Sequence, residues 1–223
     1  MTEMSVDEQD DALLLRQDRG NGIAHLTLNR PKAFNALSSH LMTALQDELD
    51  TIAKDEAVRV VIIEGAGRGF CAGHDLREVT SFETVEARRA LMAQCSQLML
   101  SVVHSPKPVI AKVHGVASAA GCQLVASCDL AVADNETRFA TPGVNIGLFC
   151  STPMVALGRN VARKHAMEML LTGEAMDAPT AYRFGLINRH VPNAALDSTV
   201  MDFAELIARK SSYTLRVGKE AFY

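Results

Sequence analysis

Short apolar runs bounded by turn residues predict the strands of this chain. Such runs, some continuous and some alternating with polar residues, occupy residues 12–17, 23–28, 58–64, 109–113 and 130–133. The first two flank the segment DRGNG, whose glycines can adopt the positive φ values of a tight turn. We therefore expect these two strands to pair as an antiparallel hairpin.

Apolar residues spaced three or four positions apart predict helices. After Ser38 this spacing continues to Ile52, and the Ser38 hydroxyl can cap the first turn. A second stripe covers residues 83–103 and ends at SPKP, because proline cannot continue a helix. Later segments at 163–171, 194–210 and 213–222 are amphipathic, and a short strand-like piece lies at 186–191.

The order of these elements predicts the fold class. Strands and helices alternate through Asp134, and the chain is mainly helical beyond Ser151. This order is typical of an α/β fold with right-handed βαβ units and a mostly parallel sheet, which binds ligands near the carboxyl ends of its strands. We expect a disordered acidic tail at 1–11, one core domain at 12–190 and a helical region at 191–223.

Composition excludes several classes of protein. The net charge of −4, without a stripe of Lys or Arg, argues against nucleic-acid binding. No apolar run reaches the roughly 20 residues that cross a bilayer, and the opening residues resemble neither a signal peptide nor a transit peptide, so we expect a cytoplasmic location. The five cysteines form no CxxC pair, which predicts reduced core thiols and no metal site.

Four motifs occur in an order that identifies a family. They are NRPKAFNAL, GRGFCAGHDL, HGVASAAGCQLVASCDLAVA and FATPGVNIGL. Together they resemble the crotonase superfamily, the enoyl-CoA hydratase/isomerase family, over about residues 23–208. The last two motifs are most similar to the enoyl-CoA hydratase domain-containing protein 3 branch of that family.

The resemblance implies a fold and an assembly. The expected fold is the crotonase (ClpP-like) fold, in which repeated ββα units form the sheet and a helical C-terminal region supports trimerisation. The expected partners are acyl-CoA and other copies of the chain, in a homotrimer or a hexamer built as a dimer of trimers. Compared with the family, the helical region 191–223 is expected to be incomplete.

The resemblance also assigns roles to individual residues. The family stabilises a thioester enolate, here by the backbone amides of His74 and Ala120, the latter at the amino end of a helix. No tightly bound cofactor is expected, since the coenzyme A thioester is itself the substrate or ligand. The residues expected beside its nucleotide and pantetheine arm are Lys32, Ala33, Phe34, Ala72, Asp75 and Leu76.

Both glutamates that a hydratase would use are missing from their places. The first position falls on Gln123, whose amide has no titratable proton, and the second falls on Gly143, which has no side chain. General acid and base groups each contribute about 10²- to 10⁴-fold to rate. We therefore expect little hydratase activity, and the sequence leaves open whether the chain is an enzyme.

Three functions remain open at this point. The first is hydration or isomerisation of an enoyl-CoA. The second is glutamate-independent decarboxylation or thioester cleavage, which is suggested by the similarity of AGHDL to a motif of the methylmalonyl-CoA decarboxylase branch and by the His74 imidazole, which titrates near neutral pH. The third is acyl-CoA binding or regulation without catalysis. His114, at a strand end, is assigned a structural role. Asp129 is either the anion partner of a neighbouring basic group or an ordinary carboxylate at the start of a strand.

Overall fold

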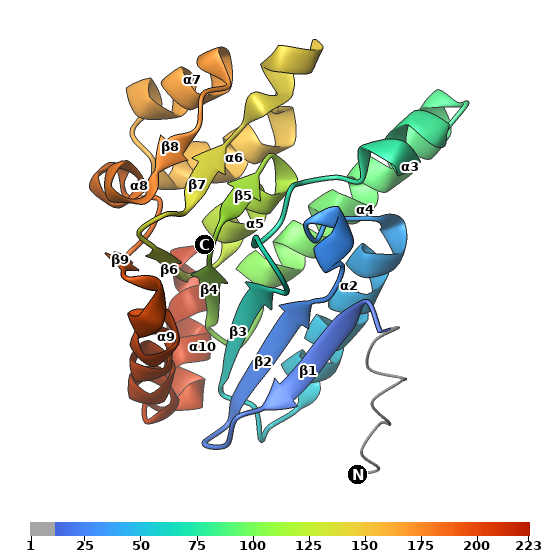
Figure 1. The fold of residues 1–223 in the computed structure, drawn as a ribbon. Coiled ribbons are helices and arrows are strands. Elements are labelled where there is room, and N and C mark those ends of the chain that lie inside the picture. Colours follow the sequence, from blue (N-terminus) through green and yellow to red (C-terminus); the bar gives the residue numbers. More distant parts are fainter. Residues whose placement is uncertain (1–11) are drawn as a thin grey trace.

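Six strands form the main sheet of the computed structural model, which describes residues 12–223 (Figure 1). In sheet order they are β1 (Leu14–Asp18), β2 (Ile23–Leu28), β3 (Val60–Gly65), β4 (Val109–Val113), β6 (Leu130–Asp134) and β9 (Arg189–Val191). β1 and β2 pair antiparallel, and every other neighbouring pair in this sheet is parallel. The predicted hairpin and the mostly parallel sheet are confirmed, whereas the predicted tail at 1–11 lies outside the described residues.

A smaller sheet lies beside the first. It contains β5 (Val116–Ser118), β7 (Arg138–Ala140) and β8 (Met176–Asp177), which are too short to give a readable alternation in the sequence. β5 and β7 are parallel and pair Ser118 with Ala140. Immediately after that pair, the Ala119 amide donates a hydrogen bond to the Ala140 carbonyl at 2.9 Å. The small sheet therefore brings the segments after β5 and β7 together.

The helices agree with the predicted stripes. Residues 83–103, 163–171, 194–210 and 213–222 match α4, α7, α9 and α10 within two residues at each end, and the Ser38 hydroxyl accepts from the Leu41 amide at 3.2 Å. The piece at 186–191 contains only β9. The helices are α2 (Ser39–Lys54), α3 (Leu76–Ser81), α4 (Val85–Val103), α5 (Ala120–Ser127), α6 (Ser151–Asn160), α7 (Arg163–Thr172), α8 (Ala178–Phe184), α9 (Asn193–Ala208) and α10 (Ser212–Phe222), with 3-10 turns η1 (Pro31–Ala33) and η2 (Pro142–Ile146).

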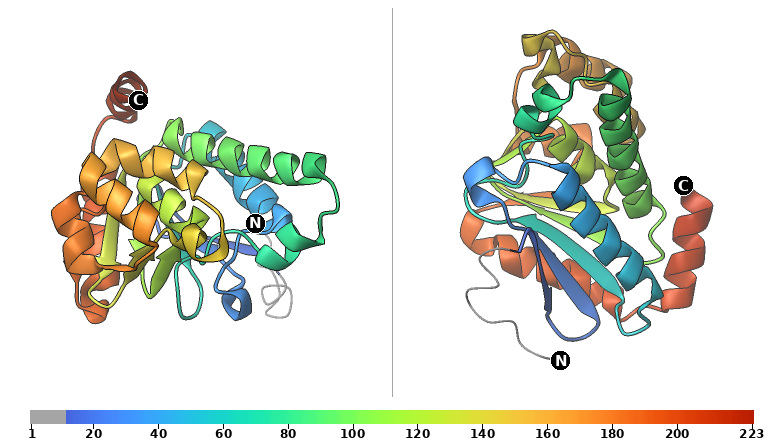
Figure 2. Two further views of the ribbon diagram at one scale, coloured as in Figure 1. Left: turned by 90° about the horizontal axis from the view of Figure 1, so that it is seen from above. Right: turned by 90° about the vertical axis from the view of Figure 1, so that its right-hand side faces the viewer.

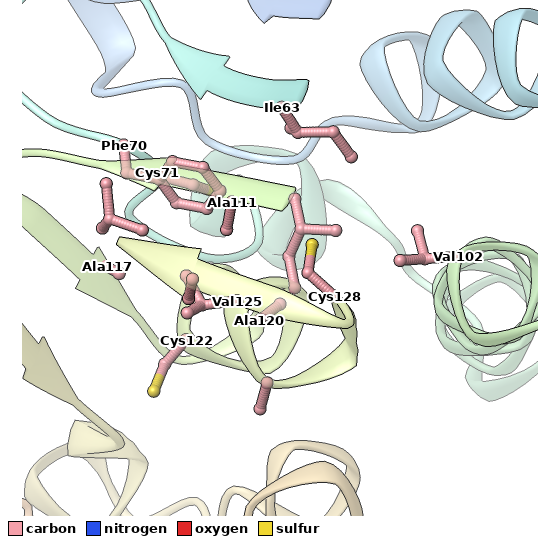
Figure 3. Packing of buried hydrophobic residues seen from close by; sticks show 14 of the residues in the cluster. Ile63, Phe70, Cys71, Val102, Ala111, Ala117, Ala120, Cys122, Val125 and Cys128 are labelled. Carbon is pink, nitrogen blue, oxygen red and sulfur yellow. The ribbon is translucent and has the colours of Figure 1, made fainter. Parts of the chain in front are cut away.

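Helices cover both faces of the main sheet. On one face a large apolar core joins the sheet to α2, α4 and α5; Figure 3 shows side chains of this core from β3 (Ile63), β4 (Ala111), α4 (Val102) and α5 (Val125). On the other face, a second cluster packs α9 against β2, β3, β4 and β6. By contrast, α10 has no buried residue and stands apart from the layers in both views of Figure 2.

A charged network crosses the α9 face of the sheet. His25 Nε2 and Lys112 Nζ lie 3.1 and 2.8 Å from the carboxylate of Glu64, and Lys112 also lies 2.8 Å from Asp197 of α9. Burial alone would raise the pKa of Glu64, but the neighbouring His25 and Lys112 side chains outweigh it and lower the pKa to about 2. The ionised carboxylate therefore stabilises the folded chain.

We expect Glu64→Gln to remove part of the acid sensitivity of folding. Because the pKa of Glu64 falls from 4.5 to about 2 on folding, its stabilisation is complete above about pH 4.5 and is lost as the pH falls towards 2. The shift corresponds to at most about 3 kcal/mol. Urea unfolding at several pH values should therefore show the gap between wild type and variant narrowing below about pH 4.5. Asp202→Asn, at an exposed position of α9, is the control, and parallel curves for wild type and Glu64→Gln would contradict this account.

Candidate functional site

A strained turn at Ala119 opens the site. Ala119 has φ 48° and ψ −117°, a conformation that residues other than glycine adopt at a cost of about 1–3 kcal/mol. It precedes α5, so the amide of Ala120 is the first of the helix, and the first amides of a helix have no carbonyl partner within it. The turn thus leaves the Ala120 N–H available to a ligand. The partial positive charge of the helix terminus lies at the same place and also attracts a negatively charged ligand atom.

The chain at Gly73 lies against this turn. Gly73 has φ 97°, and a Cβ added to it would lie 2.9 Å from Ala119 Cβ and 3.3 Å from the Ala120 amide nitrogen. The neighbouring residue His74 is held by a bridge to Leu37, whose amide donates to the Gly73 carbonyl at 2.7 Å. The structure therefore brings together the two segments that carry the predicted donors, the amides of His74 and Ala120.

Gln123 lies one helical turn beyond Ala120, at the edge of a cavity. Its side chain is buried, with a residue exposure of 6%, and its Oε1 has no hydrogen-bond partner among the described residues. The cavity has a volume of about 570 Å³. Its lining comes from α4 (Ser96, Met99, Leu100, Val103), α5 (Gln123, Ala126, Ser127), α6 (Thr152, Val155, Ala156, Arg159, Asn160) and the end of the chain (Phe222, Tyr223).

Gly143 lies in η2, where the chain folds back on itself. The Leu148 amide donates to the Gly143 carbonyl at 2.9 Å, and Gly147 between them is left-handed with φ 77°. A Cβ at position 143 would lie 2.7 Å from the Leu148 carbonyl oxygen and 2.9 Å from Cys150 Sγ. The position of the second missing glutamate therefore has no space for a side chain.

Two more buried polar atoms belong to segments that meet at the amino end of α5. Thr141 is fully buried and its Oγ1 has no partner among the described residues. His74 is only half-buried, but its Nε2 atom is buried and also has no partner among these residues. Burial lowers the pKa of His74, and the Glu78 carboxylate only partly opposes this shift, so the imidazole is neutral at pH 7. Thr141 was not among the predicted site residues, although it lies within the FATPGVNIGL motif.

The segments predicted to hold coenzyme A also meet. The Ala72 amide donates to the Phe34 carbonyl at 2.9 Å, and the ring of Phe34 lies 4.9 Å from the guanidinium of Arg68, a cation to which the sequence analysis gave no role. Asp75 is not free, because it pairs with Arg30 at 2.9 Å and caps α3.

The other predicted coenzyme residues lie on the surface of the same region. Lys32 and Ala33 form part of η1, where Lys32 is exposed and Ala33 half-buried. Leu76 begins α3 and is 52% exposed. An apolar surface beside a cation suits a nucleotide, whose base stacks on apolar groups and whose phosphates attract positive charge.

Three kinds of side chain outside the site, His114, Asp129 and the cysteines, can be compared with their predicted roles. His114 Nε2 lies 2.9 Å from the Gly67 carbonyl, in agreement with a structural role. Asp129 pairs with Lys219 at 2.7 Å, which favours the first of its two alternatives, the partner of a basic group. All five cysteines are free and buried. Within residues 12–223, no group of three or more His, Cys, Asp or Glu side chains is arranged to hold a metal ion.

Residues 18–223 match the family model described as enoyl-CoA hydratase/isomerase. The chain belongs to this family. Enoyl-CoA hydratase domain-containing protein 3 of Mus musculus is 45% identical over 203 residues, covering 91% of this chain and 68% of the mouse protein. A crystal structure of enoyl-CoA hydratase from Mycobacterium smegmatis has a TM-score of 0.94 and 50% identity, covering 96% of this chain and 83% of that one. The crystal structure of human enoyl-CoA hydratase domain-containing protein 3 has a TM-score of 0.92 and 43% identity, covering 95% of this chain and 83% of that one.

These comparisons confirm the predicted family, its branch and the crotonase fold, and they correct one expectation. The cytoplasmic location is contradicted, because the five vertebrate relatives that share 43–46% identity are all named mitochondrial. The expectation failed because charge and hydropathy do not distinguish one aqueous compartment from another. No helix within residues 12–223 is long and apolar enough to span a membrane.

Proposed function

We propose that this chain binds a coenzyme A thioester and holds its carbonyl oxygen between the backbone amides of His74 and Ala120. The observation that carries the proposal is the strained Ala119 turn, which leaves the Ala120 N–H free beside Gly73. Two fixed amides and a helix terminus stabilise negative charge as it develops on that oxygen. Such strain is retained where the surrounding structure holds it, commonly at functional sites.

The coenzyme arm then follows the surface formed by η1 and the segment after β3. The exposed ring of Phe34 and the apolar side chain of Leu76 offer contacts to the base, while Lys32 and Arg68 offer charge to the phosphates. The Asp75 carboxylate serves this surface indirectly by tying Arg30 to the start of α3. Assembly into a homotrimer or hexamer remains a prediction.

Hydration is not the function that this site supports. Adding water to an enoyl thioester needs one group to activate the water and another to deliver a proton, and neither the Gln123 amide nor Gly143 can titrate. The cavity beside Gln123 supplies space for an acyl chain, but neither Gln123 nor Gly143 brings a carboxylate to it. The site is therefore suited to binding a thioester and polarising its carbonyl.

We expect the purified chain to bind crotonyl-CoA and to hydrate it slowly. Losing two acid–base groups lowers rate by at least about 10⁴-fold, whereas ordinary enzymes turn over at about 10 s⁻¹. Titration calorimetry measures binding, loss of the enoyl absorbance measures hydration, and the infrared carbonyl band of a ¹³C-labelled thioester should shift to lower frequency on binding. Turnover near the ordinary rate would mean that other residues replace the glutamates. An unshifted carbonyl band in the bound state would rule out the two amide donors.

A further inference from the structure

Asn35 is fully buried, although it directly follows the surface turn that contains Lys32, Ala33 and Phe34. Its backbone is left-handed, with φ 54°, and so is the backbone of Phe34, with φ 49°. Residues other than glycine seldom adopt this conformation, but asparagine tolerates it better than most. Two such residues in succession cost free energy, so contacts made by the folded chain must hold them there.

The side-chain amide of Asn35 provides these contacts. Its Oδ1 accepts from the Arg30 amide at 2.9 Å, while the backbone N–H of Asn35 donates to the Arg30 carbonyl, also at 2.9 Å. Its Nδ2 donates to the carbonyls of Ala66 and Gly69, both at 2.8 Å. One buried side chain therefore closes the loop around η1 and joins that loop to the segment after β3.

The two joined segments carry the groups that the proposed function offers to the nucleotide. Phe34 immediately precedes Asn35, and Arg68 immediately precedes Gly69. The side chain of Arg68 is exposed, and its guanidinium lies 4.9 Å from the centre of the Phe34 ring. The Asn35 amide thus bonds to the main chain at the base of an exposed pair, an aromatic ring and a cation.

The amide donors at the other end of the site have separate supports. The Leu37 amide donates to the Gly73 carbonyl at 2.7 Å, and the Ala119 amide donates to the Ala140 carbonyl at 2.9 Å. Among the described residues, the hydrogen bonds of the Asn35 side chain reach neither of these segments. Loss of the Asn35 amide is therefore expected to act on the nucleotide end of the site and to spare the carbonyl end.

We propose that Asn35 is a positioning residue that sets the spacing of Phe34 and Arg68 and thereby the affinity for the nucleotide end of coenzyme A, an inference that rests on the proposed function. A ring and a guanidinium held at a fixed spacing form a surface that exists before the ligand arrives. Binding then does not have to order two exposed side chains, which would otherwise weaken it.

The experiment uses two ligands, crotonyl-CoA and adenosine 3′,5′-bisphosphate, which is the nucleotide end without the thioester. We expect calorimetry to show that Asn35→Asp binds the bisphosphate at least about tenfold more weakly than wild type. The aspartate keeps the acceptor for Arg30 but has no donor for the Ala66 and Gly69 carbonyls. The infrared carbonyl band of bound ¹³C-labelled crotonyl-CoA should keep its wild-type position. Asn21→Asp is the matched control, since Asn21 is also left-handed, with φ 53°, but is exposed in the β1–β2 turn.

A double-mutant cycle tests whether Asn35 acts through Arg68. Arg68→Met keeps an apolar stem and removes the charge, so it should weaken bisphosphate binding by itself. If Asn35 places this pair, adding Asn35→Asp to Arg68→Met should weaken binding much less than Asn35→Asp does in wild type. Additive losses would show that Asn35 supports the fold in general, and they would overturn the proposal.

The remaining outcomes separate this proposal from the proposed function. Equal affinities of wild type and Asn35→Asp for the bisphosphate would overturn the role of Asn35, as would a displaced carbonyl band in the variant, and both would leave the acyl-CoA function intact. Failure of wild type to bind crotonyl-CoA would contradict the proposed function itself. Where Asn35→Asp does not fold, NMR of the wild-type chain decides. The side-chain amide resonances of Asn35 should shift when the bisphosphate saturates the site, and unchanged resonances would overturn the proposal.

Discussion

Replacing Gly143 with glutamate is expected to lower the free energy of unfolding by more than about 2 kcal/mol and to leave crotonyl-CoA hydration at its wild-type level. The first side-chain atom would meet the Leu148 carbonyl oxygen at 2.7 Å and Cys150 Sγ at 2.9 Å. Overpacking of this kind costs about 1–3 kcal/mol, and a carboxylate forced into the contact adds to it. Substituting glutamate at position 143 therefore does not by itself restore the second hydratase carboxylate.

The matched control for Gly143→Glu is Gly143→Ala. It introduces the same Cβ without the charge, so urea unfolding should show most of the same destabilisation, and the difference between the two variants reports the cost of the carboxylate. Gln123→Glu combined with Gly143→Glu tests whether the pair acts together. A Gly143→Glu variant as stable as wild type, with faster hydration, would show that the turn between Gly143 and Leu148 opens easily.

The elements that the sequence predicted are those whose residues interact locally or repeat periodically. The β1–β2 hairpin followed from the glycines of its turn, and α2 from its apolar stripe and the Ser38 cap, because both signals lie within a few residues. The short strands β5, β7 and β8 were missed. Two or three residues show no period, and these strands exist because distant segments pair with one another.

The candidate site also combines features that the sequence predicts with features that appear only on folding. The motifs located the Ala120 turn, Gln123 and Gly143, because the family keeps their order along the chain. They could not show that Thr141 Oγ1 is buried without a partner, or that a Cβ at 143 has no space, since both facts depend on contacts made after folding. Motifs thus identified which carboxylates are missing, and only the packing showed that position 143 has no space for one.

The second large effect is expected at Gly121, the second residue of α5. A Cβ at this position would lie 2.1 Å from the Cys71 carbonyl oxygen, a backbone atom held between β5 and the Gly73 turn. Backbone cannot give way as a side chain can, so Gly121→Ala should lower the free energy of unfolding by about 3 kcal/mol or more. Urea unfolding measures this loss.

The control is a glycine in a neighbouring helix with no such contact. A Cβ at Gly158 of α6 has nothing within 4 Å, so Gly158→Ala should stabilise the chain by about 0.5–1 kcal/mol through helix propensity. If Gly121→Ala lowers the free energy of unfolding and Gly158→Ala raises it, then close approach to Cys71, and not helical propensity, requires glycine at 121. The same approach holds α5 against the segment leading to His74, so Gly121→Ala should also weaken acyl-CoA binding. A stable Gly121→Ala variant that binds acyl-CoA as wild type does would contradict the expectation that this contact holds the two amide donors in place.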